Sequence, residues 1–342
     1  MSTTTSLSTI ETTDYRELVN RFRDVQTRIR EQVHRIIVGQ EEVIDHLLLT
    51  LWVGGHCLIT GMPGTAKTLL VRTLASALGL KFKRIQFTPD LMPTDVTGTD
   101  IIEEDVTTGH RKWTFVAGPI FTNVMLADEI NRTPPKTQAA LLEAMQELSC
   151  TVRGQTYRLE PPFFVLATQN PIELEGTYPL PEAQLDRFLF NIILDYLNVK
   201  DEMEVVGRNT SGEMASVEAC TNAEEIIAFQ RLVKMVPIAE NVTRYAVELM
   251  RATRPREASA PEVIKKYVNY GASVRATQFL VLSAKARALS RGNYHVGYDD
   301  LRALVLPVLR HRVLTNFHAE SDGITVDEIL RQLLDAFPAP RD

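Results

Sequence analysis

The chain has 342 residues, of which 44% are hydrophobic and 23% are charged, and its formal net charge is −6 at pH 7. This length and composition are ordinary for a globular protein with room for two domains, and the negative charge argues against a general nucleic-acid binder, whose surface would be basic. No apolar run is long enough to span a membrane, and the first residues lack the basic and apolar regions of a secretory signal, so we expect a cytoplasmic protein.

The first part of the chain predicts two helices before the first strand. Residues 1–12 are rich in Ser and Thr, which is typical of a disordered terminus. Apolar residues recur every three or four positions over 14–36, which predicts one long amphipathic helix, and a second helix is predicted over 41–52. Val38 and Gln40 lie between these helices. They could contact an adenine base, or they could belong to a plain turn.

Residues 56–70 have the pattern of a strand, a phosphate-binding loop and a helix. An apolar run ends at Gly61, and a helical pattern of leucines begins after Lys67. Backbone N–H groups of a tight loop at a helix N-terminus bind phosphate, Lys67 can reach the β- and γ-phosphates, and the Thr68 hydroxyl can ligate magnesium. We therefore expect ATP to contact Gly61, Met62, Pro63, Gly64, Thr65, Ala66, Lys67, Thr68 and Leu69.

One residue of this loop departs from the general pattern G-x-x-x-x-G-K-[ST]. The chain has Ala66 where that pattern has its second glycine. The pattern alone therefore leaves open a glycine-containing loop with an incidental lysine. The apolar strand before the loop and the helix after it favour the phosphate-binding interpretation.

A strand, a loop and a hairpin follow the phosphate-loop helix. Residues 83–87 alternate like a strand, and 88–98 are rich in Pro, Asp and Thr, which favours a loop. The segments 100–104 and 110–116, joined by a Thr-Thr-Gly turn, predict a hairpin. Doubly wound α/β units are not ordinarily interrupted at this point, so we interpret the hairpin as an insertion.

Two acidic residues end the next strand. The run 124–127 is apolar throughout, which indicates a strand buried on both faces, and Asp128 and Glu129 follow it directly. Acids at the end of a buried strand need a positive partner, which a magnesium–nucleotide complex would supply. Asp128 would hold the magnesium, and Glu129 would act as the general base for the attacking water. The alternative is that both acids cap the helix that follows.

The remainder of the first domain predicts a helix over 136–146, a second hairpin over 149–159 and a strand over 163–168. That strand is followed by Asn170, whose amide could hold the attacking water or sense the γ-phosphate. The alternative is a turn-forming Asn before a proline. A further apolar strand is predicted over 191–194.

The second half of the chain has no strand signal, so we expect an all-helical lid over 199–342 after an α/β domain over 13–198. A hinge at 196–199 would let the lid move with nucleotide state. Residues 207–221 are polar and contain Gly and Ser, which favours a flexible connection, and Pro307 is expected to kink the helix that contains it. Helices are predicted over 223–235, 239–251, 276–291, 298–312 and 326–336.

Five motifs in this order carry a resemblance to a known family. They are Gly61-x-Pro63-Gly64-x-Ala66-Lys67-Thr68, Asp128-Glu129-Ile130-Asn131-Arg132, Ala167-Thr168-Gln169-Asn170-Pro171, the segment from Leu180 to Phe188, and Gly271-Ala272-Ser273-Val274-Arg275-Ala276. Together they resemble the MoxR family of AAA+ ATPases, in which alanine at the position of Ala66 is typical. The family usually has proline where this chain has Val274, so the backbone there is expected to differ while Arg275 keeps its place.

The resemblance implies a fold and an assembly. The fold is an α/β P-loop AAA+ core, with a parallel five-stranded sheet, flanking helices and β-hairpin insertions, followed by an all-helical lid. Members generally form hexameric rings of identical subunits with Mg-ATP at the interfaces. Arg187 would then be an arginine finger for the neighbouring subunit's γ-phosphate, or alternatively an intrachain partner of Asp186 or another acid. Arg275 would sense the γ-phosphate of its own subunit, or alternatively lie on a solvated helix face.

The resemblance also implies roles for the hairpins and a function. Such hairpins line the pore or face the substrate in related motors, so Trp113, Arg153 and Tyr157 are candidate contact residues, with packing between subunits as the alternative. The implied function is that of a Mg-ATP-dependent molecular chaperone that remodels, matures or activates a protein client, with a von Willebrand factor A-domain protein as partner. Two alternatives are an ATP-dependent assembly switch with little hydrolysis and a nucleic-acid motor.

Overall fold

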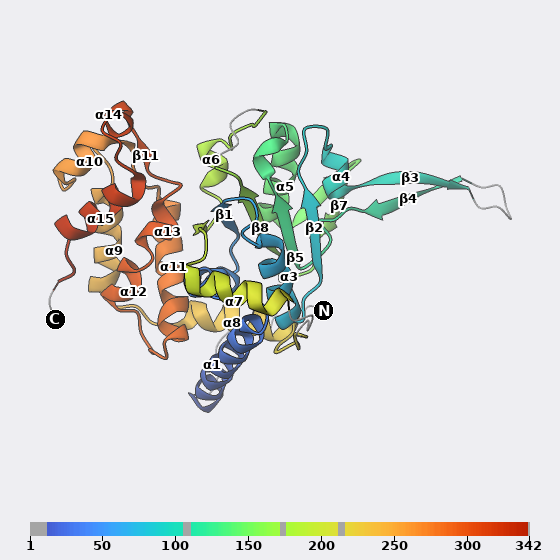
Figure 1. Ribbon diagram of the computed structural model, residues 1–342, viewed down its shortest axis with the longest axis horizontal. Helices are drawn as coiled ribbons and strands as arrows, with labels where there is room; N and C mark the ends of the chain where they lie inside the picture. The colour runs from blue at the N-terminus through green and yellow to red at the C-terminus, as the bar shows by residue number, and fades with distance from the viewer. Residues whose placement is uncertain (1–11, 105–110, 172–175, 211–215, 341–342) are drawn as a thin grey trace, which may run out of the picture.

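The structure, a computed structural model, describes residues 12–104, 111–171, 176–210 and 216–340. Figure 1 shows a central sheet covered by helices, a second group of helices beside it, and one long hairpin that extends away from both. The predicted disorder of residues 1–11 and the predicted hairpin turn within 105–110 lie outside the described residues, and Thr12 begins a helix. Within the described ranges, no helix is both long and apolar enough to cross a membrane.

A five-stranded parallel sheet in the order β2-β5-β8-β1-β9 forms the centre of the molecule. Its strands are β1 Cys57–Gly61, β2 Phe82–Gln86, β5 Val124–Asp128, β8 Phe164–Gln169 and β9 Phe190–Leu194. They confirm the predicted strands. Because the strands are parallel, their carboxyl ends meet at one edge of the sheet, which brings Gly61, Asp128 and Gln169 to that edge.

The sheet is buried on both faces, as the apolar runs predict. In β5, Val124 and Leu126 belong to one hydrophobic core, while Met125 and Ala127 belong to the core on the opposite face. This alternation of faces explains why a strand between two layers has no polar residues before its end.

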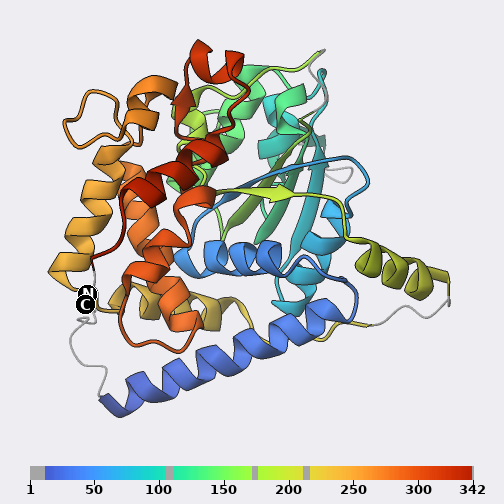
Figure 2. The ribbon, with the colours of Figure 1, turned by 60° about the vertical axis from the view of Figure 1, so that its left-hand side comes forward.

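Helices cover both faces of the sheet. They are α1 Thr12–His34, α2 Glu41–Val53, α3 Lys67–Ala77 and α5 Pro135–Glu147. Two further helices of this part of the chain are α6 Glu182–Leu185 and the largely exposed α7 Val199–Thr210. Figure 2 shows α1 running below α2 and below the second group of helices. The rings of Phe22 in α1, Trp52 in α2 and Phe229 in α8 (Ala223–Met235) meet edge to face, with centroids 5.2 to 5.7 Å apart. One core therefore joins the sheet to the second half of the chain.

The second half of the chain forms a helical lid. Its helices are α8, α9 Glu240–Ala252, α10 Glu262–Tyr267, α11 Val274–Ser290, α12 Tyr298–Arg302, α13 Val305–Leu309, α14 Phe317–Ser321 and α15 Val326–Ala336. The bounds of α8 and α15 agree with the prediction. The predicted helix over 298–312 is instead two helices, because Leu304 has φ −105° and ψ 2°. Pro307 lies in the first turn of α13. The N–H groups of a first turn have no acceptor within the helix, so a proline there removes no helical hydrogen bond.

A small sheet corrects the prediction that the lid contains helices alone. Residues Val268–Tyr270 (β10) pair antiparallel with Leu314–Thr315 (β11). Strands of two and three residues are too short to show an alternation in sequence, and their pairing partners are far apart along the chain. The predicted connection over 207–221 also needs correction at its start, because α7 continues to Thr210.

The predicted loop over 88–98 contains a short helix, α4 (Pro93–Thr97). Its proline is the first helical residue, and the Asp95 carboxylate accepts the Met92 N–H at 2.8 Å. Pro and Asp, which predict a loop, thus start and cap one helical turn. Both hairpins are confirmed, with strands β3 Gly98–Glu104, β4 Arg111–Ala117, β6 Ser149–Val152 and β7 Gln155–Arg158.

Candidate functional site

The loop between β1 and α3 needs glycine for two different reasons. A Cβ atom at Gly61 would lie 2.7 Å from the carbonyl oxygen of Leu194, so the close packing of β9 against β1 excludes a side chain there. Gly64 has φ +82° with open space around it, so its backbone conformation is what favours glycine. The loop thus has a fixed entry from the sheet and a tight turn before α3.

Ala66 has a left-handed conformation, with φ 59° and ψ 26°, directly before α3. The glycine of the general pattern would adopt this conformation without strain, whereas an alanine there costs about 1 kcal/mol. The departure at Ala66 therefore leaves the loop geometry intact and adds strain to the backbone.

Lys67 closes the loop onto itself. Its ammonium donates to the carbonyl oxygens of Gly61 at 2.9 Å and Met62 at 2.7 Å, and the Thr65 hydroxyl donates to the same Met62 oxygen at 2.8 Å. Burial lowers the pKa of Lys67, while the charges of Asp128 and Glu129 oppose that shift. The side chain of Thr68 is half-buried, and Leu69 is 43% exposed.

Asp128 ends β5 as a buried carboxylate with two partners. Its Oδ1 accepts from the Thr168 hydroxyl at 2.6 Å, and its Oδ2 accepts from Arg84 Nε at 3.0 Å and Nη2 at 2.7 Å. Both oxygens face cationic or hydroxyl donors at the carboxyl edge of the sheet. The ion pair with Arg84 therefore supplies the positive charge that an acid at the end of a buried strand needs, and Lys67 lies close enough for the charge of Asp128 to act on it.

Glu129 follows with a left-handed backbone, φ 57° and ψ 49°. Its Oε2 accepts from Gln86 Nε2 at 2.6 Å and from Arg132 Nε at 3.0 Å, while its N–H donates to Thr168 Oγ1 at 2.8 Å. The residue precedes the short 3-10 helix η1 (Ile130–Arg132), but its side chain forms no capping hydrogen bond. The helix-capping alternative therefore does not describe Glu129.

The third element at this edge is Asn170, which follows β8 and is 8% exposed. Strand β8 lies between β5 and β1, with Thr60 opposite Gln169. Asn170 directly follows Gln169 at the carboxyl edge of the sheet. Its strand lies between β1, which leads into the phosphate loop, and β5, which ends at the acids.

Arg84, Gln86, Thr168 and Arg132 hold the acids and were absent from the sequence-based set. The sequence held a signal for two of them, because Arg84 and Gln86 are two positions apart in β2 and so share one face of the strand. In the sheet, Gln86 is paired in register with Asp128. Thr168 and Arg132 belong to two of the motifs that carry the family resemblance. The pairing of strands, which the sequence does not state, was needed to connect them to the acids.

A carboxylate and a hydroxyl at this edge suit magnesium, which prefers oxygen ligands and is held in proteins by one or two carboxylates together with phosphates. Among the described residues, no group of three or more His, Cys, Asp or Glu side chains forms a metal site by itself. At this edge of the sheet, Thr68 contributes a hydroxyl group and Asp128 a carboxylate.

Val38 and Gln40 lie at the start of α2. Val38 is 7% exposed, and Gln40 has a left-handed backbone and donates from Nε2 to the carbonyl oxygen of Asp195 at 3.3 Å. Asp195 directly follows β9, the strand next to β1. The segment 38–40 thus adjoins the same carboxyl edge as the phosphate loop.

Arg187 lies after α6 and contacts α5. Its Nη1 donates to the carbonyl oxygen of Leu142 at 2.9 Å. In the part of the chain that the structure describes, no carboxylate forms an ion pair with it, so the alternative pairing with Asp186 is not formed. The guanidinium borders an open hollow of about 320 Å³ whose other lining residues are Ala139, Glu143, Gln146, Glu147 and Gln184.

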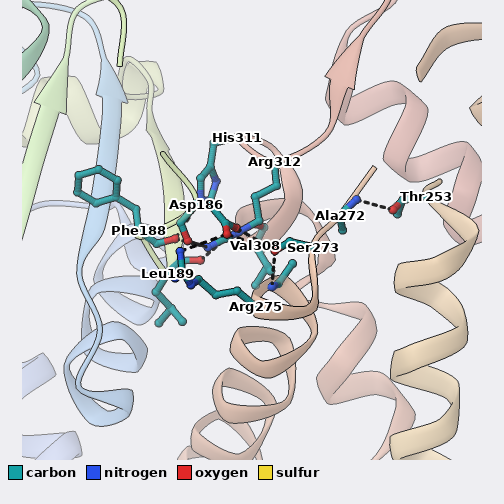
Figure 3. A network of polar contacts seen from close by, with 11 residues as sticks. Asp186, Phe188, Leu189, Thr253, Ala272, Ser273, Arg275, Val308, His311 and Arg312 are labelled. Atoms are coloured by element: carbon teal, nitrogen blue, oxygen red, sulfur yellow. Dashed lines mark hydrogen bonds and ion pairs between the residues drawn. The ribbon is translucent and has the colours of Figure 1, made fainter. Parts of the chain in front are cut away.

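Arg275 belongs to a network in which the lid contacts the core (Figure 3). Its Nη1 lies 3.3 Å from Asp186 Oδ2, so the side chain, 43% exposed, is an ion-pair partner rather than a purely solvated group. Val274 is the first residue of α11, a position that suits proline but does not require it. The helix therefore starts normally, with the Ser273 hydroxyl accepting the Ala276 N–H at 3.3 Å.

Arg312, which the sequence did not single out, is the buried member of this network. Its Nε donates to Asp186 Oδ1 at 2.8 Å, and its guanidinium lies 5.1 Å from the ring centre of Phe279. Burial lowers the pKa of Arg312 to about 10, and the hydrogen bond to Asp186 opposes that shift.

The two hairpins contact each other. The Arg153 guanidinium lies 4.1 Å from the ring centre of Trp113, and Tyr157 stacks on Phe115 with centroids 3.9 Å apart. Trp113 is 53% exposed. Tyr157 therefore packs within its own subunit, whereas Trp113 with Arg153 presents an exposed aromatic–cation pair.

Comparison with known proteins agrees with this geometry. A family model described as "ATPase family associated with various cellular activities (AAA)" matches residues 56–190, and an AAA lid domain model matches 261–333. A crystal structure from Cytophaga hutchinsonii, of a protein assigned to the ATPases, is similar with a TM-score of 0.90 and 39% identity, covering 97% of this chain and 100% of that one.

Curated relatives extend over nearly the whole chain. An uncharacterized protein, YeaC, from Bacillus subtilis is 41% identical over 91% of this chain and 93% of its own length. Chaperone MoxR1 from Mycobacterium tuberculosis is 40% identical over 91% of this chain and 81% of its own, and Protein MoxR from Methylorubrum extorquens is 31% identical over 93% and 96%. With its phosphate loop, paired acids and helical lid, the chain belongs to the MoxR family of AAA+ ATPases.

Proposed function

We propose that this protein is a Mg-ATP-dependent ATPase that acts as a molecular chaperone in the cytoplasm, remodelling, maturing or activating a protein client. The observation that carries the proposal is the meeting of Lys67, Asp128, Glu129 and Asn170 at one edge of the sheet, beside a loop of backbone N–H donors. A relative named as a chaperone supports the second part of the proposal.

Each residue at this edge has a role in the proposal. The residues from Gly61 to Leu69 bind the phosphates, and Val38 and Gln40 contact the adenine. Thr68 and Asp128 hold magnesium, which neutralises charge on the phosphates when bound. Lys67 must leave the carbonyl oxygens of Gly61 and Met62 to reach the phosphates.

Glu129 removes a proton from the attacking water, and Asn170 orients that water. In the structure Glu129 is engaged by Gln86 and Arg132, so its carboxylate must exchange these donors for the water before it can act as a base. Arg275 senses the γ-phosphate within its own subunit, since it is exposed and lies at the lid boundary.

We further propose a ring of identical subunits, with six as the expected number, in which Arg187 completes the neighbouring site. Support comes from its position beside an open hollow and from the absence of an intrachain carboxylate partner among the described residues. An arginine placed beside the transferred phosphate accelerates hydrolysis by about 10³- to 10⁵-fold. A von Willebrand factor A-domain protein is the partner we expect for the assembly.

The test is the rate of Mg-ATP hydrolysis per subunit over a wide range of protein concentration. We expect a rate that rises and then saturates, because sites are completed by assembly. Glu129→Gln should abolish hydrolysis while nucleotide binding remains, and Arg187→Ala should lower hydrolysis by about 10³-fold. A rate per subunit that is independent of concentration, and equal in the monomer, would refute the shared site.

A second candidate is an ATP-dependent assembly switch with little hydrolysis. The observation in its favour is that Gln86 and Arg132 engage the proposed base in the structure. A Glu129→Gln variant that still binds ATP and retains full biological activity would favour the switch. Loss of that activity would favour the hydrolysing chaperone. Salt-sensitive stimulation of hydrolysis by DNA would instead favour a nucleic-acid motor.

A further inference from the structure

The residue directly before Arg187 is attached to the lid. The Asp186 carboxylate accepts hydrogen bonds from Ser273 Oγ at 3.2 Å, Arg275 Nη1 at 3.3 Å and Arg312 Nε at 2.8 Å (Figure 3). Ser273 and Arg275 lie at the start of α11, and Arg312 follows α13. Three lid side chains from two elements therefore converge on the carboxylate next to the proposed finger.

These contacts differ in how readily they can be given up. The side chain of Arg312 is 2% exposed, and besides the carboxylate it binds the carbonyl oxygens of Asp186 at 3.0 Å and Leu189 at 3.1 Å. The side chain of Arg275 is 43% exposed, and its contact with Asp186 is 3.3 Å long. If Arg275 moves to a γ-phosphate, Asp186 therefore remains attached to the lid through Arg312.

The residues beside Arg312 extend the attachment. His311 Nε2 lies 3.0 Å from the carbonyl oxygen of Phe188, and Arg310 Nη1 donates to the carbonyl oxygen of Asn191 at 2.7 Å. Three consecutive lid residues thus bind the backbone that leads from α6 into β9. A displacement of this part of the lid cannot leave that backbone in place without breaking several hydrogen bonds.

The side chain of Arg187 forms its hydrogen bond with the core rather than with the lid. Its guanidinium donates to the carbonyl oxygen of Leu142 in α5, which belongs to the core. The backbone of Arg187 is therefore held through Asp186 by the lid, while the end of its side chain rests on the core. Its direction depends on both.

We propose that Asp186 and Arg312 are positioning residues for Arg187, through which the lid of one subunit sets the place of the cation that it offers to its neighbour's ATP. The inference rests on the proposed action of Arg187 between subunits. A misplacement of about 1 Å at a reacting centre can cost about 10²-fold in rate, so a small lid movement is sufficient. A nucleotide that moves one lid thereby changes hydrolysis in the next subunit.

The test uses assemblies mixed from two kinds of full-length subunit. One kind has an intact site and is the minority. The other is in large excess and carries Glu129→Gln, so it hydrolyses nothing itself but offers its finger to the intact sites. We measure hydrolysis per intact site when the excess subunit carries Glu129→Gln alone, or together with Asp186→Asn, Arg312→Lys or Arg187→Ala.

Asp186→Asn in the excess subunit is expected to lower hydrolysis by the intact sites about tenfold, less than Arg187→Ala does. Arg312→Lys keeps the charge but not the fork that reaches several oxygens, so we expect a loss of the same kind and smaller size. If Arg187→Ala lowers the rate but Asp186→Asn does not, the inference is wrong and the shared site stands. If Arg187→Ala has no effect, the shared site itself fails.

A matched control separates positioning from a general loss of lid stability. Glu225 in α8 forms an ion pair with Arg21 in α1 at 2.6 Å, and its side chain is 20% exposed, close to the 22% of Asp186. Glu225→Gln in the excess subunit removes a comparable ion pair of the lid that does not involve the segment next to Arg187. We expect it to lower the thermal midpoint as Asp186→Asn does, without lowering hydrolysis by the intact sites. An equal loss of hydrolysis in both variants would overturn the proposal.

Discussion

Replacing Thr168 with Val would remove one hydroxyl from the point where the two acids meet. That hydroxyl donates to Asp128 Oδ1 at 2.6 Å and accepts the N–H of Glu129 at 2.8 Å, and the side chain is fully buried. Val has nearly the same shape as Thr, so the packing remains while both hydrogen bonds are lost. The change therefore isolates the contribution of these two bonds.

The expected cost follows from the chemistry of the partners. A hydrogen bond to a charged group contributes about 1.5–3 kcal/mol, and one between neutral groups about 1 kcal/mol. We therefore expect Thr168→Val to lower the free energy of unfolding by about 3 kcal/mol. Glu129 would also lose a partner that holds its left-handed backbone, so turnover should fall more than nucleotide affinity.

The assay compares urea unfolding, nucleotide binding and steady-state hydrolysis in the wild type, Thr168→Val and Thr168→Ser. Serine keeps the hydroxyl and loses only a methyl group, so this control should retain most of the turnover. A valine variant with wild-type unfolding midpoint and turnover would refute the reasoning. So would a serine variant as inactive as the valine variant.

Three further predictions concern backbone strain, pH and magnesium. Ala66→Gly should leave the free energy of unfolding unchanged or raise it by up to about 1 kcal/mol and retain hydrolysis, because glycine adopts φ 59° without strain; thermal unfolding checks this, and a clear loss of stability would contradict it. Burial lowers the pKa of His56 from 6.5 to about 4. Between these pH values the unfolded chain binds a proton that the folded chain does not, so the free energy of unfolding should fall as the pH drops from 6.5 to 4. Urea unfolding at several pH values should show a smaller decrease for His56→Gln than for the wild type. Arg84→Met should lower the magnesium concentration for half-maximal hydrolysis by a few-fold, because Arg84 occupies Asp128 Oδ2; an unchanged magnesium titration would count against this competition.

The elements that the sequence predicted well are those whose signal is local. A strand buried on both faces is a short apolar run, so β5 and its acids are evident without knowledge of the fold. The phosphate loop is a contiguous motif, and its position between β1 and α3 followed directly. Helices α8 and α15 each have a regular apolar repeat in their own sequence, so their bounds could be predicted without knowing which elements pack against them.

The features that escaped prediction depend on contacts between distant residues. Arg312 and Asp186 are 126 positions apart, and nothing in the local sequence of either indicates the other. Gln86 contacts Glu129 only because β2 and β5 are neighbours in register. The pairing of β10 with β11 likewise joins strands too short to recognise alone.

The aromatic cluster of Phe22, Trp52 and Phe229 restricts how the lid can turn. These rings are completely buried and connect α1, α2 and α8 in one close-packed core, which resists deformation. The lid is therefore anchored to the core at α8, while α10 and α14 lie at the end of the lid farthest from this anchor (Figure 1). Helix α1 is thus part of the contact that holds the lid to the core. We expect that shortening this helix would weaken the contact without altering the residues at the nucleotide site.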